Sequence, residues 1–116
     1  MKVVMDTNFL ITAIKFKIPF LQELKGDELF IVDKTKYELE KLIKGGNASD
    51  KQLAKIALEL ISKNKIKIIR SEKEDSVDKT LEKLHGYIIA TQDKELKDKL
   101  KGKIIVIRAK KKLELR

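Results

Sequence analysis

Short runs of apolar and β-branched residues recur along the chain, bounded by polar residues or glycine, which is the pattern of buried strands. The final segment, Ala109–Arg116, has a weaker pattern that fits either a short strand or an ordered tail. Within the clear runs the apolar residues are unbroken rather than alternating, which favours strands covered on both faces. The expected strands are Lys2–Met5, Leu29–Val32, Ile66–Ile69, Tyr87–Ala90 and Ile104–Ile107.

Apolar residues at helical spacing fill the intervals between these strands. The expected helices are Phe9–Phe16, Phe20–Lys25, Thr35–Ile43, a longer helix from Ser49 or Asp50 to about Ser62, one that begins at Asp75 or Ser76 and stops before Gly86, and Asp93–Leu100. Strands that alternate with helices predict βαβ units with right-handed crossovers. We therefore expect an α/β fold, a three-layer α/β/α arrangement with a central, mostly parallel five-stranded sheet, in a single domain over residues 1–116.

The composition excludes several classes of protein. With 116 residues, 42% of them hydrophobic, the chain is long enough to bury a core of its own. The absence of cysteine excludes disulfides and thiolate metal sites. No apolar run approaches the length that spans a membrane, and the N-terminus lacks the apolar stretch of a signal peptide. We therefore expect a cytoplasmic protein with no membrane partner.

Positive charge is concentrated near the C-terminus. The whole chain carries a net charge of +9, and residues 94–116 hold ten basic residues against three acidic ones. Such an excess favours a polyanionic partner, although a solvated, Lys-rich surface has the same composition. Within the basic segment 108–116, the candidates for phosphate contacts are Arg108, Lys110, Lys111 and Lys112.

Acidic residues follow four of the expected strands. Asp6 and Asp93 come directly after or close after a strand, whereas Glu38 and Asp78 lie in the first turns of the helices that follow one. Each acid has a structural alternative. Asp6 and Asp93 fit helix N-caps, Asp78 fits a first-turn acid that favours the helix dipole, and Glu38 fits a capping box with Thr35.

The shared position of these acids carries more information than any one of them. Helices in a parallel α/β sheet begin at the edge where the strands end, so the acids are expected to converge on one crevice. Two carboxylates about 5 Å apart repel each other by about 3 kcal/mol at an effective dielectric of about 20. Protonation or splaying into water would relieve the repulsion, and so would a hard cation such as Mg²⁺ or Mn²⁺.

Four short motifs resemble, in order and spacing, those of the PIN-domain ribonucleases. They are Met-Asp-Thr-Asn at 5–8, Tyr-Glu-Leu-Glu at 37–40, Ser-Val-Asp at 76–78 and Ala-Thr-Gln-Asp-Lys-Glu-Leu at 90–96. The resemblance extends over nearly the whole chain. The basic end, from Arg108 to Leu115, is most similar to the archaeal branch related to small-subunit ribosomal RNA processing nucleases.

The resemblance implies a Mg²⁺- or Mn²⁺-dependent endonuclease that acts on single-stranded RNA, with ribosomal RNA as one candidate substrate. The catalytic and metal-binding residues that it implies are Asp6, Glu38, Asp78 and Asp93, with Thr7, Asn8, Thr91 and Gln92 in support. Two positions depart from the family pattern, because Gln92 stands where Asn is frequent and Lys79 stands where a second Asp is frequent. Family resemblance also suggests a homodimer through Phe16 and Phe20.

Three other functions remain open. A toxin ribonuclease of a toxin–antitoxin pair uses the same chemistry with a different protein partner. A PIN-like module that binds RNA or protein without turnover is consistent with Lys79 and Gln92. A receiver-like phosphoacceptor domain also places acids at strand ends, but it predicts paired acids after the first strand, where this chain has Asp6 followed by Thr7 and Asn8.

Overall fold

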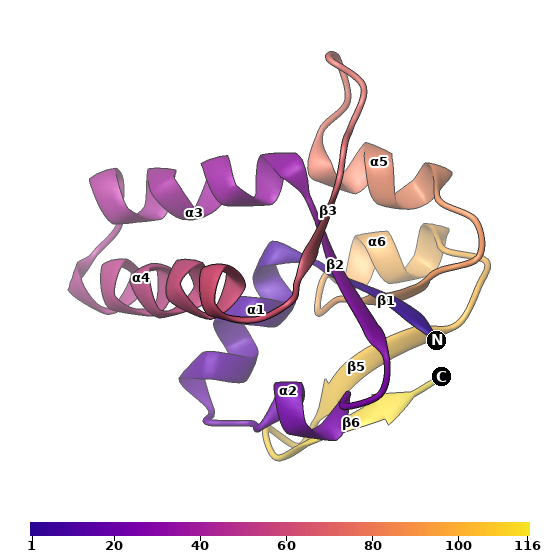
Figure 1. Ribbon diagram of the computed structural model, residues 1–116, viewed down its shortest axis with the longest axis horizontal. Helices are drawn as coiled ribbons and strands as arrows, with labels where there is room; N and C mark the ends of the chain where they lie inside the picture. Colours follow the sequence, from indigo (N-terminus) through magenta and orange to yellow (C-terminus); the bar gives the residue numbers. More distant parts are fainter.

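The computed structural model describes residues 1–116 and has one mixed sheet with helices on both faces (Figure 1). The elements in chain order are β1 (Lys2–Met5), α1 (Thr7–Lys15), α2 (Phe20–Glu23), β2 (Glu28–Val32), α3 (Asp33–Gly45), α4 (Ala48–Lys63), β3 (Lys67–Ile69), α5 (Val77–Lys83), β4 (Ile88–Ala90), α6 (Lys94–Lys99), β5 (Ile104–Arg108) and β6 (Lys112–Leu115). The three-layer, mostly parallel α/β fold expected from the sequence is confirmed.

The order of the strands determines where a crevice forms. The sheet runs β3-β2-β1-β4-β5-β6, and every neighbouring pair is parallel except β5 and β6. The chain first builds outward from β1 through β2 to β3, and then continues on the other side of β1 with β4 and β5. Connections leaving β1 and β4 therefore diverge at the carboxyl ends of these strands, the position where α/β sheets bind ligands.

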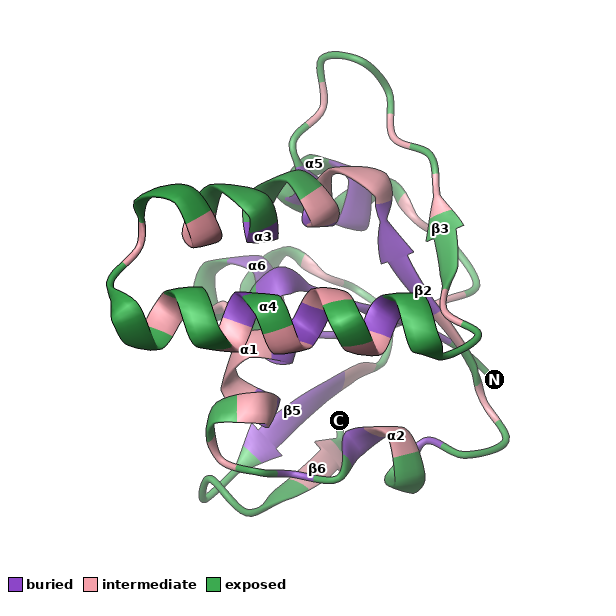
Figure 2. Ribbon diagram, turned by 60° about the vertical axis from the view of Figure 1, so that its left-hand side comes forward, coloured by how far each residue is buried: buried purple, intermediate pink, exposed green.

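Side chains of the sheet alternate between two hydrophobic cores. In β1, Val3 and Met5 pack with α1, α3 and α4, whereas Val4 packs on the opposite face with α5 and α6. The side chains of Val3, Val4 and Met5 are fully buried, which agrees with unbroken apolar strands covered on both faces. Figure 2 shows the same burial in the middle of the sheet, where the labelled strands β2 and β5 are coloured mostly as buried. Packing on both faces fixes the position of the central strands. It therefore also fixes the position of the residues that directly follow them.

A sixth strand corrects the expected count of five. The segment Lys112–Leu115 forms β6, which pairs antiparallel with β5. The turn between them places Ala109 and Lys110 at φ values of 55° and 56°, in the left-handed region that glycine and asparagine usually occupy in tight hairpins. Because neither residue type is present there, the sequence carries no hairpin signal, and the strand could be read as a tail.

Three helices also begin earlier than their local patterns suggested, and the first of them, α1, begins at Thr7 rather than at Phe9. β2 runs straight into α3, which begins at Asp33 rather than at Thr35. α4 is capped by Asn47, whose side chain accepts from the Asp50 amide at 2.8 Å, rather than by Ser49 or Asp50. None of the helices is long and apolar enough to span a membrane.

Candidate active site

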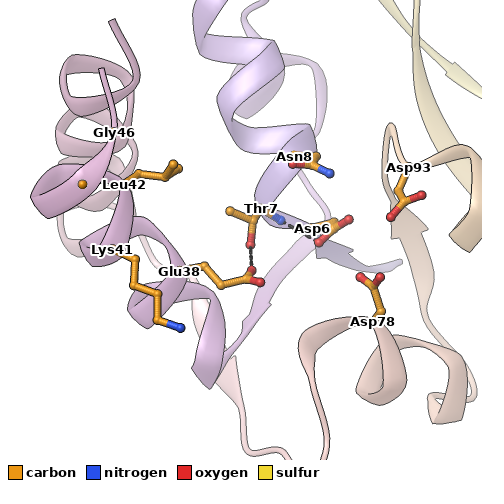
Figure 3. Close-up of a pocket in the computed structure, with 10 residues that line it drawn as sticks. Asp6, Thr7, Asn8, Glu38, Lys41, Leu42, Gly46, Asp78 and Asp93 are labelled. Carbon is orange, nitrogen blue, oxygen red and sulfur yellow. Dashed lines mark hydrogen bonds between the residues drawn. The ribbon is translucent and has the colours of Figure 1, made fainter. Parts of the chain in front are cut away.

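A polar cavity lies at the carboxyl ends of β1 and β4, and the four predicted acids line it together (Figure 3). The carboxylates of Asp6, Asp78 and Asp93 point toward one another, and Glu38 approaches from the α3 side. Their elements are separated widely in the sequence and meet only through the sheet topology. The lining residues are Asp6, Thr7, Asn8, Glu38, Lys41, Leu42, Gly45, Gly46, Asp78 and Asp93.

Asp6 is the buried anchor of the site, with 3% of its surface exposed. Its Oδ1 accepts from the Thr7 amide at 2.8 Å and so caps α1, and its Oδ2 accepts from Thr91 Oγ1 at 2.9 Å. Burial raises the pKa of Asp6 to about 6; the hydrogen bonds from Thr91 and Thr7 oppose this shift, and the charges of Asp78 and Glu38 add to it. The expected N-cap is confirmed, and it leaves the second oxygen atom facing the site.

Asp93 is likewise both a cap and a cavity residue. Its Oδ1 accepts from the amides of Glu95 and Leu96 at 3.0 and 3.3 Å, at the start of α6. Its Oδ2 accepts no hydrogen bond within the chain and remains available at the cavity. The Asp93 amide donates to Thr91 Oγ1 at 3.1 Å, so the Thr91 hydroxyl joins the two strand ends that carry Asp6 and Asp93.

Asp78 reaches the cavity from the first turn of α5, a helix capped by Ser76. Partial burial, with the charge of Asp93 as the second cause, raises the pKa of Asp78. The nearby cation that opposes this pKa shift is Lys99 of α6, not the adjacent Lys79. Lys79 contributes its backbone amide to the Ser76 cap at 3.1 Å and forms no ion pair with Asp78.

Glu38 corrects the capping-box interpretation. Because α3 begins at Asp33, Glu38 lies in its second turn and cannot reach an N-cap amide. Its carboxylate instead accepts a hydrogen bond from the Thr7 hydroxyl, the first residue of α1. The Thr35 hydroxyl, the other half of the expected box, is buried without a hydrogen-bond partner. Asn8 lies beside Thr7 and lines the cavity.

Gln92 has a structural contact rather than one with the acids. Its Oε1 accepts from the Ile107 amide at 2.7 Å, and its Nε2 donates to the Ile107 carbonyl at 3.5 Å. The side chain thereby continues the pairing of β4 with β5 beyond the last β4 residue, Ala90. An asparagine side chain is one methylene shorter than Gln92. The departure from the family pattern at this position therefore affects the pairing of β4 with β5 rather than the contacts of the acids.

A polar clamp at the start of α3 holds the loop that precedes α5. Asp33 accepts from the amide and hydroxyl of Ser71 at 3.2 and 2.7 Å. Lys34 Nζ donates to the carbonyls of Glu72 and Lys73 at 2.8 and 3.0 Å, and also to the carbonyl of Asp75. The Asp33–Lys34 clamp therefore fixes the chain that enters α5 and carries Asp78. Sequence reasoning missed it, although Asp33 directly follows a strand.

The basic residues proposed for phosphate contacts lie at the β5–β6 turn and none lines the cavity. Arg108 pairs with Glu114 at 2.9 Å, and the Lys110 ammonium lies 5.3 Å from the ring centre of Phe16. Since β5 is parallel to β4, this turn follows the same edge of the sheet as the acids. The basic residue that does line the cavity is Lys41, which the sequence analysis overlooked although it lies one helical turn after Glu38.

The donor set is made of oxygen atoms and suits a hard cation. No three acidic or histidine side chains are grouped closely enough to enclose a metal ion by themselves. Carboxylate oxygen atoms are ligands that Mg²⁺ and Mn²⁺ take, whereas zinc sites usually include histidine or cysteine. The raised pKa of Asp6, caused by burial and increased by the charges of Asp78 and Glu38, likewise marks a place where positive charge would be stabilised.

Comparisons with known proteins agree with this geometry. A family model described as a PIN-like domain matches residues 3–112. Ribonuclease VapC4 of Methanocaldococcus jannaschii is 32% identical, with 98% of this chain and 95% of that protein aligned. The fold matches the PIN domain endonuclease Utp24 with a TM-score of 0.77 at 23% identity, over 97% of this chain and 90% of that one. A domain of a functionally unknown Methanocaldococcus jannaschii protein matches with a TM-score of 0.51 at 18% identity, over 84% and 81% of the two chains. The chain therefore belongs to the PIN-domain ribonuclease family.

Proposed function

We propose that this protein is a Mg²⁺- or Mn²⁺-dependent endoribonuclease that hydrolyses phosphodiester bonds in single-stranded RNA. The single observation that supports this most directly is the convergence of Asp6, Glu38, Asp78 and Asp93 on one cavity at the β1/β4 crevice. The family assignment and the name of the aligned relative, a ribonuclease, support the substrate class. We assign these four acids to metal binding and catalysis.

The residues around the acids prepare the site before any ligand binds. Thr91 and the Thr7 amide hold both oxygen atoms of Asp6, and the α6 amides fix Asp93 with one oxygen left free. When bound, a divalent ion would supply an activated water and neutralise charge on the phosphate. One or two of Asp6, Asp78 and Asp93 would hold that ion directly and the rest would contact its water ligands, while Glu38 would close the α3 side of the site, where it accepts from Thr7.

The test is cleavage of a fluorescent single-stranded RNA in the presence and absence of Mn²⁺. We expect Asp6→Asn and Asp93→Asn to abolish cleavage while the melting temperature shows that both variants fold. Asp98→Asn is the matched control, because Asp98 lies exposed on α6, the same helix that Asp93 caps. Equal cleavage by the wild type and the two site variants would identify a contaminating nuclease and refute the proposal.

The cellular substrate is a separate step of the proposal. We place this chain in ribosomal RNA processing on the resemblance of the basic end, Arg108 to Leu115, to that branch of the family. The match to the PIN domain endonuclease Utp24 shows the fold alone. The toxin alternative shares the active site and the chemistry and differs in its protein partner, and the likeness to Ribonuclease VapC4 supports the chemistry in both cases. Preferential cleavage of precursor ribosomal RNA over messenger and transfer RNA would favour processing, and the reverse preference would favour the toxin.

A further inference from the structure

One aromatic side chain is largely exposed and forms no pair with another ring or with a cation. Tyr37 is 63% exposed on α3, directly before Glu38. The other aromatic rings are all engaged: Phe9 with Phe20 and Phe30 with Tyr87 in edge-on pairs, and Phe16 beneath the Lys15 and Lys110 ammonium groups. Tyr37 packs against no other ring, and its hydroxyl makes no hydrogen bond.

The second unpartnered group is the ammonium of Lys41. It is the one basic side chain that lines the acidic cavity, and it is exposed. Some other lysines are engaged, such as Lys34 with the loop before α5 and Lys83 with Asp75 at 2.7 Å, so Lys41 is set apart by its position at the cavity and not by its free ammonium alone. Lys41 forms no ion pair even though Glu38 lies on the preceding turn of the same helix, where Figure 3 shows the two side chains on neighbouring positions.

Helical geometry places these two side chains on one strip with Glu38. Residues three and four apart are neighbours on a helix surface, so Lys41 adjoins both Glu38 (three residues) and Tyr37 (four residues). The strip therefore presents, in order around α3, a carboxylate of the cavity, a cation and an exposed ring. This is the combination with which proteins hold single-stranded nucleic acid, where a cation contacts the phosphate and a ring stacks on the base.

We propose that Tyr37 and Lys41 form a binding subsite for the nucleotide that neighbours the cleaved bond. In this subsite Lys41 contacts the flanking phosphodiester and Tyr37 stacks on the base, so the RNA strand crosses α3 on its way into the cavity. Neither group reads the hydrogen-bonding edge of a base, so the subsite accepts any base. The inference rests on the proposed function, since it names how that same site receives its substrate.

The experiment measures binding separately from turnover. Fluorescence anisotropy with a labelled 12-nucleotide single-stranded RNA is recorded in the Asp93→Asn background, which holds the strand without cleaving it. The variants are Tyr37→Ala, Tyr37→Phe, Lys41→Gln and, as a control, Lys55→Gln, whose lysine is exposed on α4 outside the cavity. Melting temperatures establish that all of them fold.

We expect Tyr37→Ala to weaken binding about tenfold and Tyr37→Phe to bind as tightly as the parent, because the ring rather than the hydroxyl makes the contact. An abasic nucleotide at the stacked position should remove the difference between Tyr37→Ala and the parent. Lys41→Gln should lower the slope of log affinity against log salt by about 0.7, the value for one phosphate contact on a single strand, and Lys55→Gln should leave it unchanged.

Unchanged binding by Tyr37→Ala, an equal loss in Tyr37→Phe, or equal salt slopes for Lys41→Gln and Lys55→Gln would each overturn the subsite. Cleavage by the wild type is assayed in parallel. A wild type that cleaves RNA while the Tyr37 and Lys41 variants bind normally refutes the subsite alone. A wild type that never cleaves, although binding follows the expected pattern, refutes the proposed nuclease and leaves the subsite standing.

Discussion

The Thr91 hydroxyl donates a hydrogen bond of 2.9 Å to Asp6 Oδ2, although 85 residues separate the two in the chain. Both residues are buried, and each follows one of the two neighbouring strands β1 and β4. The same hydroxyl oxygen accepts from the Asp93 amide at 3.1 Å. A single hydroxyl therefore stabilises the charged form of one acid and positions the segment that carries another.

Thr91→Val removes this hydroxyl with little change of shape. The hydrogen bond from Thr91 lowers the pKa of Asp6 against the effect of burial, so its loss should raise that pKa further above its present value of about 6. We expect the acid limb of the pH–rate profile for Mn²⁺-dependent cleavage to move to higher pH. Thr91→Ser keeps the hydroxyl and should keep the wild-type limb. Profiles between pH 5 and 9 that coincide for Val and Ser would contradict this role.

Asp6→Asn should change how stability depends on pH in metal-free protein. The folded-state pKa of Asp6 is raised from 3.8 to about 6, so the folded protein holds this proton more tightly than the unfolded chain does. The free energy of unfolding of the wild type therefore falls as pH rises from about 4 to about 6, by about 2 to 3 kcal/mol, and then levels. Asn carries no such proton, so this decrease should be absent from its urea unfolding curves in EDTA.

The same variant should lose the stabilisation that a bound ion provides. Millimolar Mn²⁺ is expected to raise the melting temperature of the wild type, because the ion binds the native state. Asp6→Asn should show no rise, whereas Asp98→Asn should behave as the wild type does. If millimolar Mn²⁺ left the melting temperature of the wild type unchanged, the result would count against the metal site as a whole.

The positions of the acids could be predicted because they depend only on the order of strands and helices. Parallel strands end at one edge of the sheet, so Asp6 and Asp93 lie close together there whether or not they also cap their helices. The capping alternative was also right for both, because a carboxylate has two oxygen atoms and one suffices for the cap. For Glu38 the local pattern misled, since α3 begins two residues before the Thr35 that resembled its cap.

Features that depend on loop conformation could not be read from the sequence. The Lys34 contacts join residues 38 to 41 positions apart, and their partners are backbone carbonyls, which any residue type supplies. In the β5–β6 turn, Ala109 and Lys110 adopt a left-handed backbone conformation, which these residue types do not predict. Lys41, by contrast, could have been found from the sequence, because it lies within the expected helix three residues after Glu38, on the same face.

Gly46 and its neighbour provide a matched test of the α3–α4 connection, which forms one wall of the cavity. A Cβ on Gly46 would lie 2.6 Å from the Leu42 carbonyl oxygen, whereas a Cβ on Gly45 would meet nothing within 4 Å. We expect Gly46→Ala to lower the free energy of unfolding by about 1 to 3 kcal/mol. Gly45→Ala should raise it by about 0.5 to 1 kcal/mol, since alanine favours the helix end. Urea unfolding measures both, and equal effects would contradict the close approach at Gly46.

The Asp33–Lys34 clamp predicts that a residue outside the cavity affects the chemistry. Lys34→Met removes three carbonyl contacts from the loop that leads into α5, so Asp78 should lose its fixed position. We expect Mn²⁺ affinity and cleavage rate to fall about tenfold, at the lower end of the effect of groups that orient metal ligands. Lys36→Met is the control, because Lys36 lies on the same helix and makes no hydrogen bond or ion pair. Both variants are assayed well below their melting temperatures, so that unfolding does not account for lost activity. Equal activity of the two would show that the clamp only stabilises the loop, whereas a selective loss in Lys34→Met would show that it positions Asp78.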